Sequence, residues 1–136
     1  MEARAAALQA QMYGGEYHGD EEQGGDGGEQ QAAKAWHGNF RQWMPIMAGD
    51  DFLGLHNYTR FIYNADGIFS PPGAEMTQAG YEHTPDSLAA VVRAVAAECK
   101  LPIYVTENGL AGDDDTRRIA FVDRALAGLH QCIADG

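Results

Sequence analysis

The stretch LPIYVTENG, residues 101–109, is the part of the sequence that indicates the fold most strongly. Its first six residues are mostly apolar or β-branched, and they are too few for a stable helix, so they predict a short buried strand. Polar residues follow at once, and Gly109 indicates a turn. The predicted strand therefore presents Glu107 and Asn108 at its carboxyl end.

A second stretch has the same form. The segment FLGLHNY, residues 52–58, starts with a compact apolar run and ends with polar side chains. It predicts another strand, which delivers His56, Asn57 and Tyr58 at its carboxyl end.

Two amphipathic helices are predicted after these strands. One begins at Thr84 and Pro85, a capping residue followed by proline at the first helical position. The other begins at about Thr116, and the aspartates at 113–115 favour its amino terminus, which predicts capping rather than metal binding. The apolar faces are predicted to be Leu88, Val91, Val92, Val95 and Cys99 in the first, and Ile119, Val122, Leu126, Leu129 and Ile133 in the second.

The order of strand, helix, strand and helix is typical of parallel β/α folds. About two such units are visible, and two parallel strands cannot make a closed sheet. The prediction is an α/β chain that is a fragment of a larger fold. A small doubly wound fold is disfavoured, because no glycine-rich phosphate turn follows either strand. The connection over residues 61–83 is predicted to be irregular, and long loops of this kind tend to be functional.

The beginning of the chain has a different composition. Residues 1–31 hold seven acidic residues against one basic residue, and residues 14–28 hold seven glycines. Such a segment buries too little apolar area to offset its ordering entropy, so residues 1–31 are predicted to be a disordered acidic tail, with at most a frayed helix over 2–12. Residues 32–136 are the predicted folded domain.

Composition excludes several functions. A net charge of −11, with no run of lysine or arginine, argues against nucleic acid as a partner. No stretch is apolar enough for a membrane span or a signal peptide, so we expect a cytoplasmic chain with no membrane association. Cys99 and Cys132 have no neighbouring ligands, which predicts reduced thiols, no metal and no cofactor.

The carboxyl ends of neighbouring parallel strands meet at one edge of a sheet, where β/α barrels carry their active sites. Tyr58 and Glu107 are therefore expected in one cleft. From this pattern alone, a glutamate after an apolar strand is more often a solvated loop residue.

The segment YVTENG, residues 104–109, resembles the nucleophile signature of glycoside hydrolase family 1. The segment DFLGLHNYTR, residues 51–60, is similar to the preceding barrel strand of that family. The resemblance covers roughly residues 49–136 and implies the sixth and seventh units of a (β/α)₈ TIM barrel. It implies a retaining β-glycosidase, β-glucosidase-like, that acts on O-glycosyl bonds of a β-glucoside or related carbohydrate.

The resemblance also assigns roles. Glu107 matches the nucleophile, which forms a covalent glycosyl-enzyme. Tyr58 matches the tyrosine that hydrogen-bonds and orients that carboxylate. Substrate binding is assigned to His56, Asn57 and Asn108, with His56 standing where the family has asparagine and Asn108 lying behind the glutamate.

One family motif is absent. Asn-Glu-Pro, which carries the acid/base glutamate, occurs nowhere in the sequence. A retaining mechanism requires two carboxylates about 5–5.5 Å apart, so the isolated chain is expected to be inactive. The alternative is a catalytically inactive barrel fragment that acts as a sugar-binding or assembly module and associates through its open sheet edges.

Overall fold

The centre of the molecule is a three-stranded parallel sheet. The computed structural model describes residues 5–9, 12–13 and 25–136 of the chain. In this part of the chain the strand order is β1-β3-β6, and both pairings are parallel. The strands are β1 (Ala5–Gln9), β3 (Phe52–Asn57) and β6 (Ile103–Asn108).

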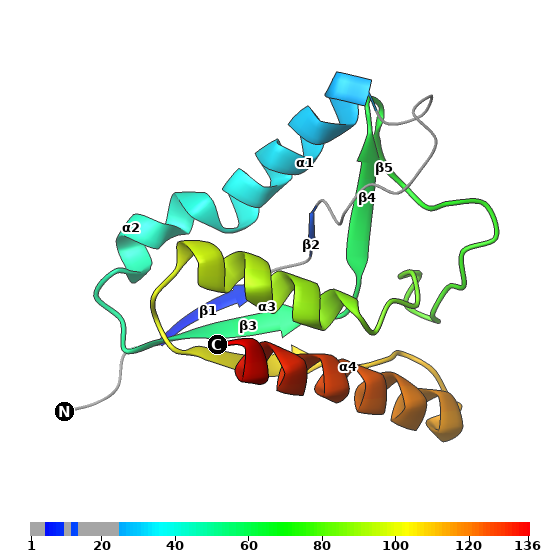
Figure 1. Cartoon of the computed structure of the whole chain (residues 1–136). Coiled ribbons are helices and arrows are strands. Elements are labelled where there is room, and N and C mark those ends of the chain that lie inside the picture. The colour runs from blue at the N-terminus through cyan, green and yellow to red at the C-terminus, as the bar shows by residue number, and fades with distance from the viewer. Residues whose placement is uncertain (1–4, 10–11, 14–24) are drawn as a thin grey trace.

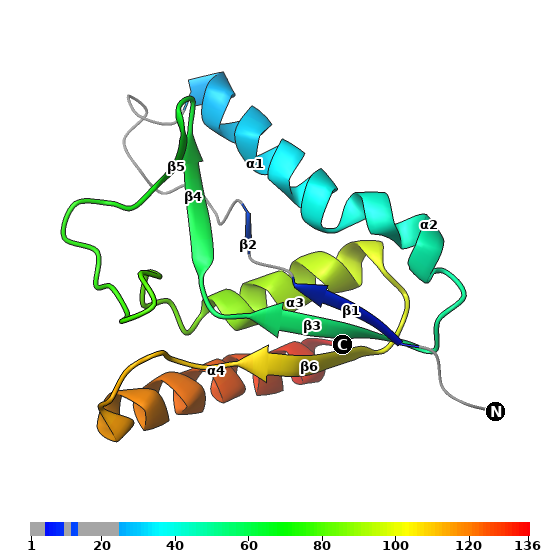
Figure 2. The same ribbon diagram turned by 180° about the vertical axis from the view of Figure 1, so that it is seen from behind.

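Helices alternate with these strands and cover one face of the sheet. Figure 1 shows α3 and α4 in front of the strands, and Figure 2, from behind, shows the strands in front of the same helices. The alternation of strands and helices is consistent with a fragment of a β/α barrel. The helices are α1 (Gly25–Asn39), the 3₁₀ helix η1 (Arg41–Trp43), α2 (Met44–Met47), α3 (Ser87–Glu98) and α4 (Asp115–Asp135).

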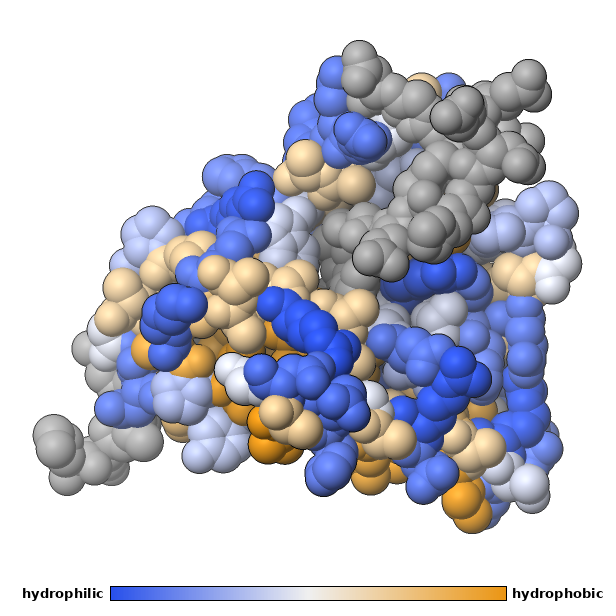
Figure 3. Space-filling view, viewed as in Figure 1, coloured by the Kyte–Doolittle hydropathy of each residue, from blue (hydrophilic) through white to orange (hydrophobic). Residues whose placement is uncertain are grey.

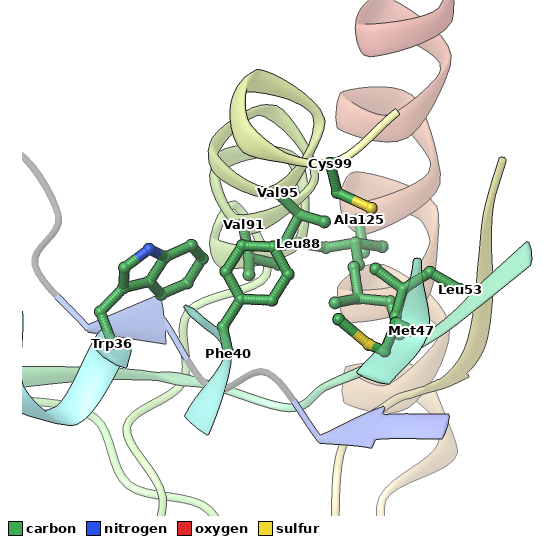
Figure 4. Close-up of a cluster of buried hydrophobic side chains, with 10 residues drawn as sticks. Trp36, Phe40, Met47, Leu53, Leu88, Val91, Val95, Cys99 and Ala125 are labelled. Carbon is green, nitrogen blue, oxygen red and sulfur yellow. The ribbon is translucent and has the colours of Figure 1, made fainter. Parts of the chain in front are cut away.

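The main hydrophobic core lies between the sheet and the helices. Figure 4 shows side chains from α1, α3 and β3 pointing toward one another in this layer. The predicted apolar face of α3 is confirmed, since Leu88, Val91, Val95 and Cys99 are all buried. Both cysteines are free thiols, and Cys132 is half-buried.

The predicted tail differs from the structure wherever residues 1–31 are described. Residues 5–9 form β1, which pairs in register with β3, so the sheet contains three parallel strands rather than two. Alanine and glutamine favour helix on their own, but pairing satisfies the backbone groups along the edge of β3, and tertiary context overrides propensity. The remaining part of the predicted tail, at 1–4, 10–11 and 14–24, lies outside the described residues.

Two glycines of the predicted tail have a packing role in α1. A Cβ on Gly27 would lie 2.7 Å from Cβ of Ala65, and one on Gly28 would lie 2.6 Å from the carbonyl oxygen of Tyr63. These residues therefore let α1 approach the neighbouring hairpin closely, which a linker composition does not reveal.

The loop predicted over residues 61–83 begins with regular structure. A second sheet has the order β2-β4-β5, in which β4 and β5 form an antiparallel hairpin. Its turn is set by Asn64, whose Oδ1 accepts hydrogen bonds from the amides of Asp66 at 2.9 Å and Gly67 at 3.0 Å. The chain is irregular after this hairpin, apart from one isolated bridge. The three strands are β2 (Met12–Tyr13), β4 (Arg60–Asn64) and β5 (Gly67–Phe69).

Helix α4 packs on a face that matches the predicted one only in part. Val122 and Leu129 are half-buried, and Leu129 packs against the core. Phe121 and Ala125 are buried, whereas Ile119, Leu126 and Ile133 are 69%, 55% and 74% exposed. Figure 3 shows apolar patches along the lower edge of the molecule, over α4. The helix carries apolar residues on more than one side, and the side that faces α3 is the buried one.

The starts of α3 and α4 are capped differently. Asp114 accepts hydrogen bonds from the amides of Thr116 and Arg117, which confirms the predicted capping. Thr84 does not cap α3, which begins at Ser87 with Asp86 as its N-cap residue. The hydroxyl of Thr84 instead accepts a hydrogen bond from the backbone amide of Arg60. In the described part of the chain, no helix has the length and apolar character that spanning a membrane requires.

Candidate active site

The carboxyl ends of β3 and β6 bring a phenol and a carboxylate together. Tyr58 directly follows β3, and Glu107 is the second-last residue of β6. The hydroxyl of Tyr58 donates a hydrogen bond to Oε2 of Glu107 at 2.5 Å. A short bond of this kind between hydroxyl and carboxylate fixes the orientation of the carboxylate.

A β-bulge determines the direction in which Glu107 points. The pairing of β3 with β6 shifts between Leu55 and His56, so that His56 lies opposite Glu107. Strict alternation along β6 would place Glu107 beside Asn57, on the helix-covered face. The bulge moves the carboxylate to the open face, where its side chain is 47% exposed.

His56 also approaches the carboxylate. Its Nδ1 lies 3.4 Å from Oε2 of Glu107, and its side chain is 22% exposed. Tyr58 and His56 thus converge on the same oxygen atom. Within the described part of the chain, the other oxygen, Oε1, has no hydrogen-bond partner. One carboxylate oxygen is therefore oriented by two side chains, and the other carries no such contact within the described residues.

The two asparagines assigned to substrate binding lie in different surroundings, and only Asn108 lines the hollow beside Tyr58. Asn57 is completely buried, and its amide group bonds to the carbonyl oxygen of Thr59 at 2.9 Å and to the hydroxyl of Ser87 at 2.8 Å. Asn108 is half-buried and donates to the carbonyl oxygen of Asn57 at 2.7 Å. Asn57 therefore does not reach a bound sugar, because strand alternation turns it toward the helices.

Ser87 was not expected in this region from the sequence, and Thr59 was expected only as a polar residue after the strand, with no role. Both are buried polar residues, with exposures of 5% and 0%. The available signal was weak: Ser87 is a small polar residue in the first turn of α3, where serine is common for reasons of local structure alone.

The hydrogen bond changes the titration of the phenol. Donation to Glu107 raises the pKa of Tyr58 above its ordinary value, and partial burial adds to the effect. The cause is that ionisation removes the shared proton and places two negative charges together. Tyr58 therefore remains a neutral donor over the physiological range.

A hollow of about 510 Å³ lies beside Tyr58. It is lined in part by Tyr58, Asn108 and Leu110, and by Thr77 and Tyr81 from the loop after the hairpin. Its volume falls within the range of small-molecule sites, and its lining mixes apolar surface with a few polar groups. The loop predicted to be functional therefore forms a wall of the space next to the site.

Comparison with known proteins relates this geometry to one class of enzyme. No protein-family model matches the chain. The structure is similar to that of β-glycosidase BGL167, with 32% sequence identity and a TM-score of 0.75, over 98% of this chain and 28% of that chain. It is also similar to β-glucosidase 1317, with 32% identity and a TM-score of 0.71, over 97% of this chain and 30% of that chain.

A more distant structure supports the fold alone. The family 1 β-glucosidase from Thermotoga maritima, solved in complex with isofagomine lactam, has 16% identity and a TM-score of 0.78, over 97% of this chain and 38% of that chain. This chain thus spans between 28% and 38% of the length of the three structures. The similarity extends over nearly the whole chain, beyond the 49–136 region expected from sequence motifs.

Proposed function

We propose that this chain is the nucleophile-bearing part of a retaining β-glycosidase of glycoside hydrolase family 1, acting on O-glycosyl bonds of β-glucosides or related carbohydrates. In this proposal β3 and β6 are the sixth and seventh strands of a (β/α)₈ barrel. The strand β1, which was not expected from the sequence, is then the fifth.

The observation that carries the proposal is the hydrogen bond between Tyr58 and Glu107 at the ends of adjacent parallel strands. In β/α barrels this end of the sheet is where catalytic residues lie. The YVTENG motif and the 32% identity to two β-glycosidases support the same assignment.

The reaction would use the free oxygen of Glu107. Oε1 attacks the anomeric carbon and forms a glycosyl ester, while the bond from that carbon to the leaving oxygen breaks. The leaving oxygen then needs a proton, which the family takes from the glutamate of Asn-Glu-Pro. Because the sequence lacks that motif, turnover of alkyl glycosides is expected to be negligible.

An activated substrate tests the nucleophile without the missing acid. In an aryl β-glucoside of a strongly acidic phenol, the leaving group departs as the phenolate and needs no proton, while the glucosyl group is transferred to the carboxylate. We expect the purified chain to gain the mass of one hexosyl group, located at Glu107 by peptide mass spectrometry. Water attack then lacks its general base, so the ester should accumulate.

Two variants complete this test. Glu107→Gln should abolish the adduct, because the amide is a poor nucleophile. Glu29→Gln, at an exposed glutamate in α1, is the matched control and should leave the adduct unchanged. An adduct of equal yield in Glu107→Gln, or its absence from the parent chain, would argue against the proposal.

A second candidate function is that of an assembly module. Ile119, Leu126 and Ile133 are exposed on α4, the helix that follows β6 in the chain, and β6 is an edge strand within the described sheet. A polypeptide supplying the remaining β/α units would pair with that edge and cover those side chains. We would mix the chain with a polypeptide that carries the remaining barrel units of β-glycosidase BGL167, and measure complex formation by sedimentation velocity.

Substitutions among the exposed apolar residues of α4 test whether this surface is the interface. Leu126→Lys with Ile133→Lys should abolish the complex, whereas Ala127→Lys, elsewhere on the exposed surface of α4, should preserve it. A complex that survives the double substitution would exclude this surface as the interface.

A further inference from the structure

The backbone on both sides of Tyr58 is anchored beneath the surface. Asn57 and Thr59 are each 0% exposed, although the phenol between them reaches the open face. The side-chain amide nitrogen of Asn57, Nδ2, donates a hydrogen bond to the backbone carbonyl oxygen of Thr59 at 2.9 Å. The Asn57 side chain therefore spans Tyr58 and closes a turn around it.

The side-chain oxygen of Asn57 is hydrogen-bonded to α3. Since the carbonyl of Thr59 only accepts hydrogen bonds, the amide nitrogen of Asn57 must face it, and Oδ1 is left to accept from the hydroxyl of Ser87 at 2.8 Å. Ser87 is the first residue of α3. In the described part of the chain, no buried side-chain nitrogen or oxygen lacks a partner. Each buried side-chain nitrogen and oxygen of the network therefore has a partner, and such networks favour one geometry.

The same residue is bound to the strand that carries Glu107. Asn108 donates to the carbonyl oxygen of Asn57 at 2.7 Å and pairs with Asn57 in the register that follows the bulge. Asn57 thus binds Asn108, the neighbour of Glu107, through its backbone carbonyl. It binds Thr59, the neighbour of Tyr58, through its side chain.

We propose that Ser87, Asn57 and Asn108 are positioning residues, which together set the distance between the Tyr58 hydroxyl and the Glu107 carboxylate. This inference rests on the proposed function of Glu107 as a nucleophile. For Asn57, which is completely buried, it replaces the expected contact with substrate, whereas Asn108 also lines the hollow beside Tyr58. Ser87 fixes the amide of Asn57, that amide fixes the backbone around Tyr58, and Asn108 holds the shifted register of β6.

The titration of Tyr58 reports on this positioning without any substrate. Glu107 and Tyr81 are the ionisable groups that act on Tyr58, and its pKa is raised mainly by the hydrogen bond to Glu107. If the phenol moves away from the carboxylate, its pKa falls toward the ordinary value. A role limited to stability would lower the free energy of unfolding and leave the titration of Tyr58 unchanged.

The experiment is an ultraviolet tyrosinate titration of the full chain, read as the difference between each variant and the same variant with Tyr58→Phe. Asn57→Ala, Ser87→Ala and Asn108→Ala are each expected to lower the pKa of Tyr58 by about half a unit or more, a change of roughly threefold in its ionisation constant. Asn39→Ala is the matched control, because it removes an asparagine bond to the carbonyl of Ala35, within α1.

Each outcome decides the question. An unchanged Tyr58 titration in the folded Ser87→Ala and Asn108→Ala variants would overturn the inference, even if Asn57→Ala fails to fold. An equal shift in Asn39→Ala would also overturn it, since the effect would then be global. A parent chain that forms no glycosyl adduct but shows the expected titrations would remove the proposed nucleophile and keep the positioning network.

Discussion

The two faces of the central sheet differ in what they contribute. On the helix-covered face, Leu53, Leu55 and Asn57 are completely buried, whereas on the open face Tyr104 is 58% exposed and Glu107 is also exposed. All five residues lie on the adjacent strands β3 and β6, which pair side by side. The covered face provides the core and the network that holds the strand ends, and the open face carries the group proposed to react.

This difference separates the main core from the proposed site. Burial of apolar side chains against α1, α3 and β3 needs only residues that the chain contains. In the proposed barrel the open face would line the interior, which the side chains of other strands help to fill. Stability and chemistry should therefore respond to different substitutions.

The largest effect is expected for Leu55→Ala on the covered face. Truncation leaves a cavity among fully buried side chains, which should lower the free energy of unfolding by about 2–5 kcal/mol. Tyr104→Ala, on the open face, should lose about 1 kcal/mol, mainly from its ring contact with Phe52. Guanidinium unfolding followed by tryptophan fluorescence measures both. Equal losses would show that the faces do not differ in this way.

A glycine pair in α1 provides the next test of the covered side. Gly28→Ala places a methyl group against the carbonyl of Tyr63 and should lower stability by about 1–3 kcal/mol. Gly38→Ala has open space around its Cβ and should raise stability by up to about 1 kcal/mol through helix propensity. Thermal unfolding of both variants gives the comparison, and a stabilised Gly28→Ala would contradict the close packing of α1 on the hairpin.

Sequence patterns predicted the elements whose burial follows one regular period. The strand at 52–57 and the helix with Leu88, Val91 and Val95 on one face were found because apolar residues recur at strand or helix spacing. Helix α4 shows the limit of this reasoning. It carries apolar residues on two sides, and only its contact with α3 decides that Phe121 is buried and Ile119 is not.

Other features depend on contacts between distant segments. The strand β1 forms by pairing with β3, so an Ala-rich sequence gives no local indication of it. Gly27 and Gly28 lie in a glycine-rich segment that resembles a linker, but in the structure they allow α1 to pack closely on the hairpin. At the site, the motif identified Glu107 and Tyr58 as neighbours in space. The bulge that turns Glu107 to the open face, and the burial of Asn57, follow from the pairing register.

A smaller effect is expected at the start of α4, which lies on the covered side. Asp114→Ala removes the acceptor for the amides of Thr116 and Arg117 and should lower the free energy of unfolding by about 1 kcal/mol. Asp113→Ala is the control, because its carboxylate accepts instead from the side chain of Gln78 and should change stability by less than about 0.5 kcal/mol. Urea unfolding of both measures the difference, and the reverse order would assign the cap to Asp113.

The smallest effect concerns an ion pair at the edge of the helix layer. Arg41 and the indole of Trp36 donate hydrogen bonds to Glu98 at the end of α3, and the bond from Arg41 is the main reason why the pKa of Glu98 lies below its ordinary value. A lowered pKa in the folded state stabilises the protein fully above the ordinary pKa of about 4.5, and this stabilisation is lost as the pH falls through the folded-state value. The effect should be modest, because the side chain of Arg41 is 49% exposed.

Glu98→Gln should therefore reduce the loss of stability on acidification from about pH 5 to pH 3, measured by urea unfolding at each pH. Glu29→Gln, an exposed glutamate in α1, should leave the pH dependence of the parent. Salt should weaken the Glu98 effect, since the ion pair is near the surface. The same pH dependence in Glu98→Gln and the parent would mean that this contact does not hold α1 to α3. The acid sensitivity of the covered side would then have to arise elsewhere in the helix layer.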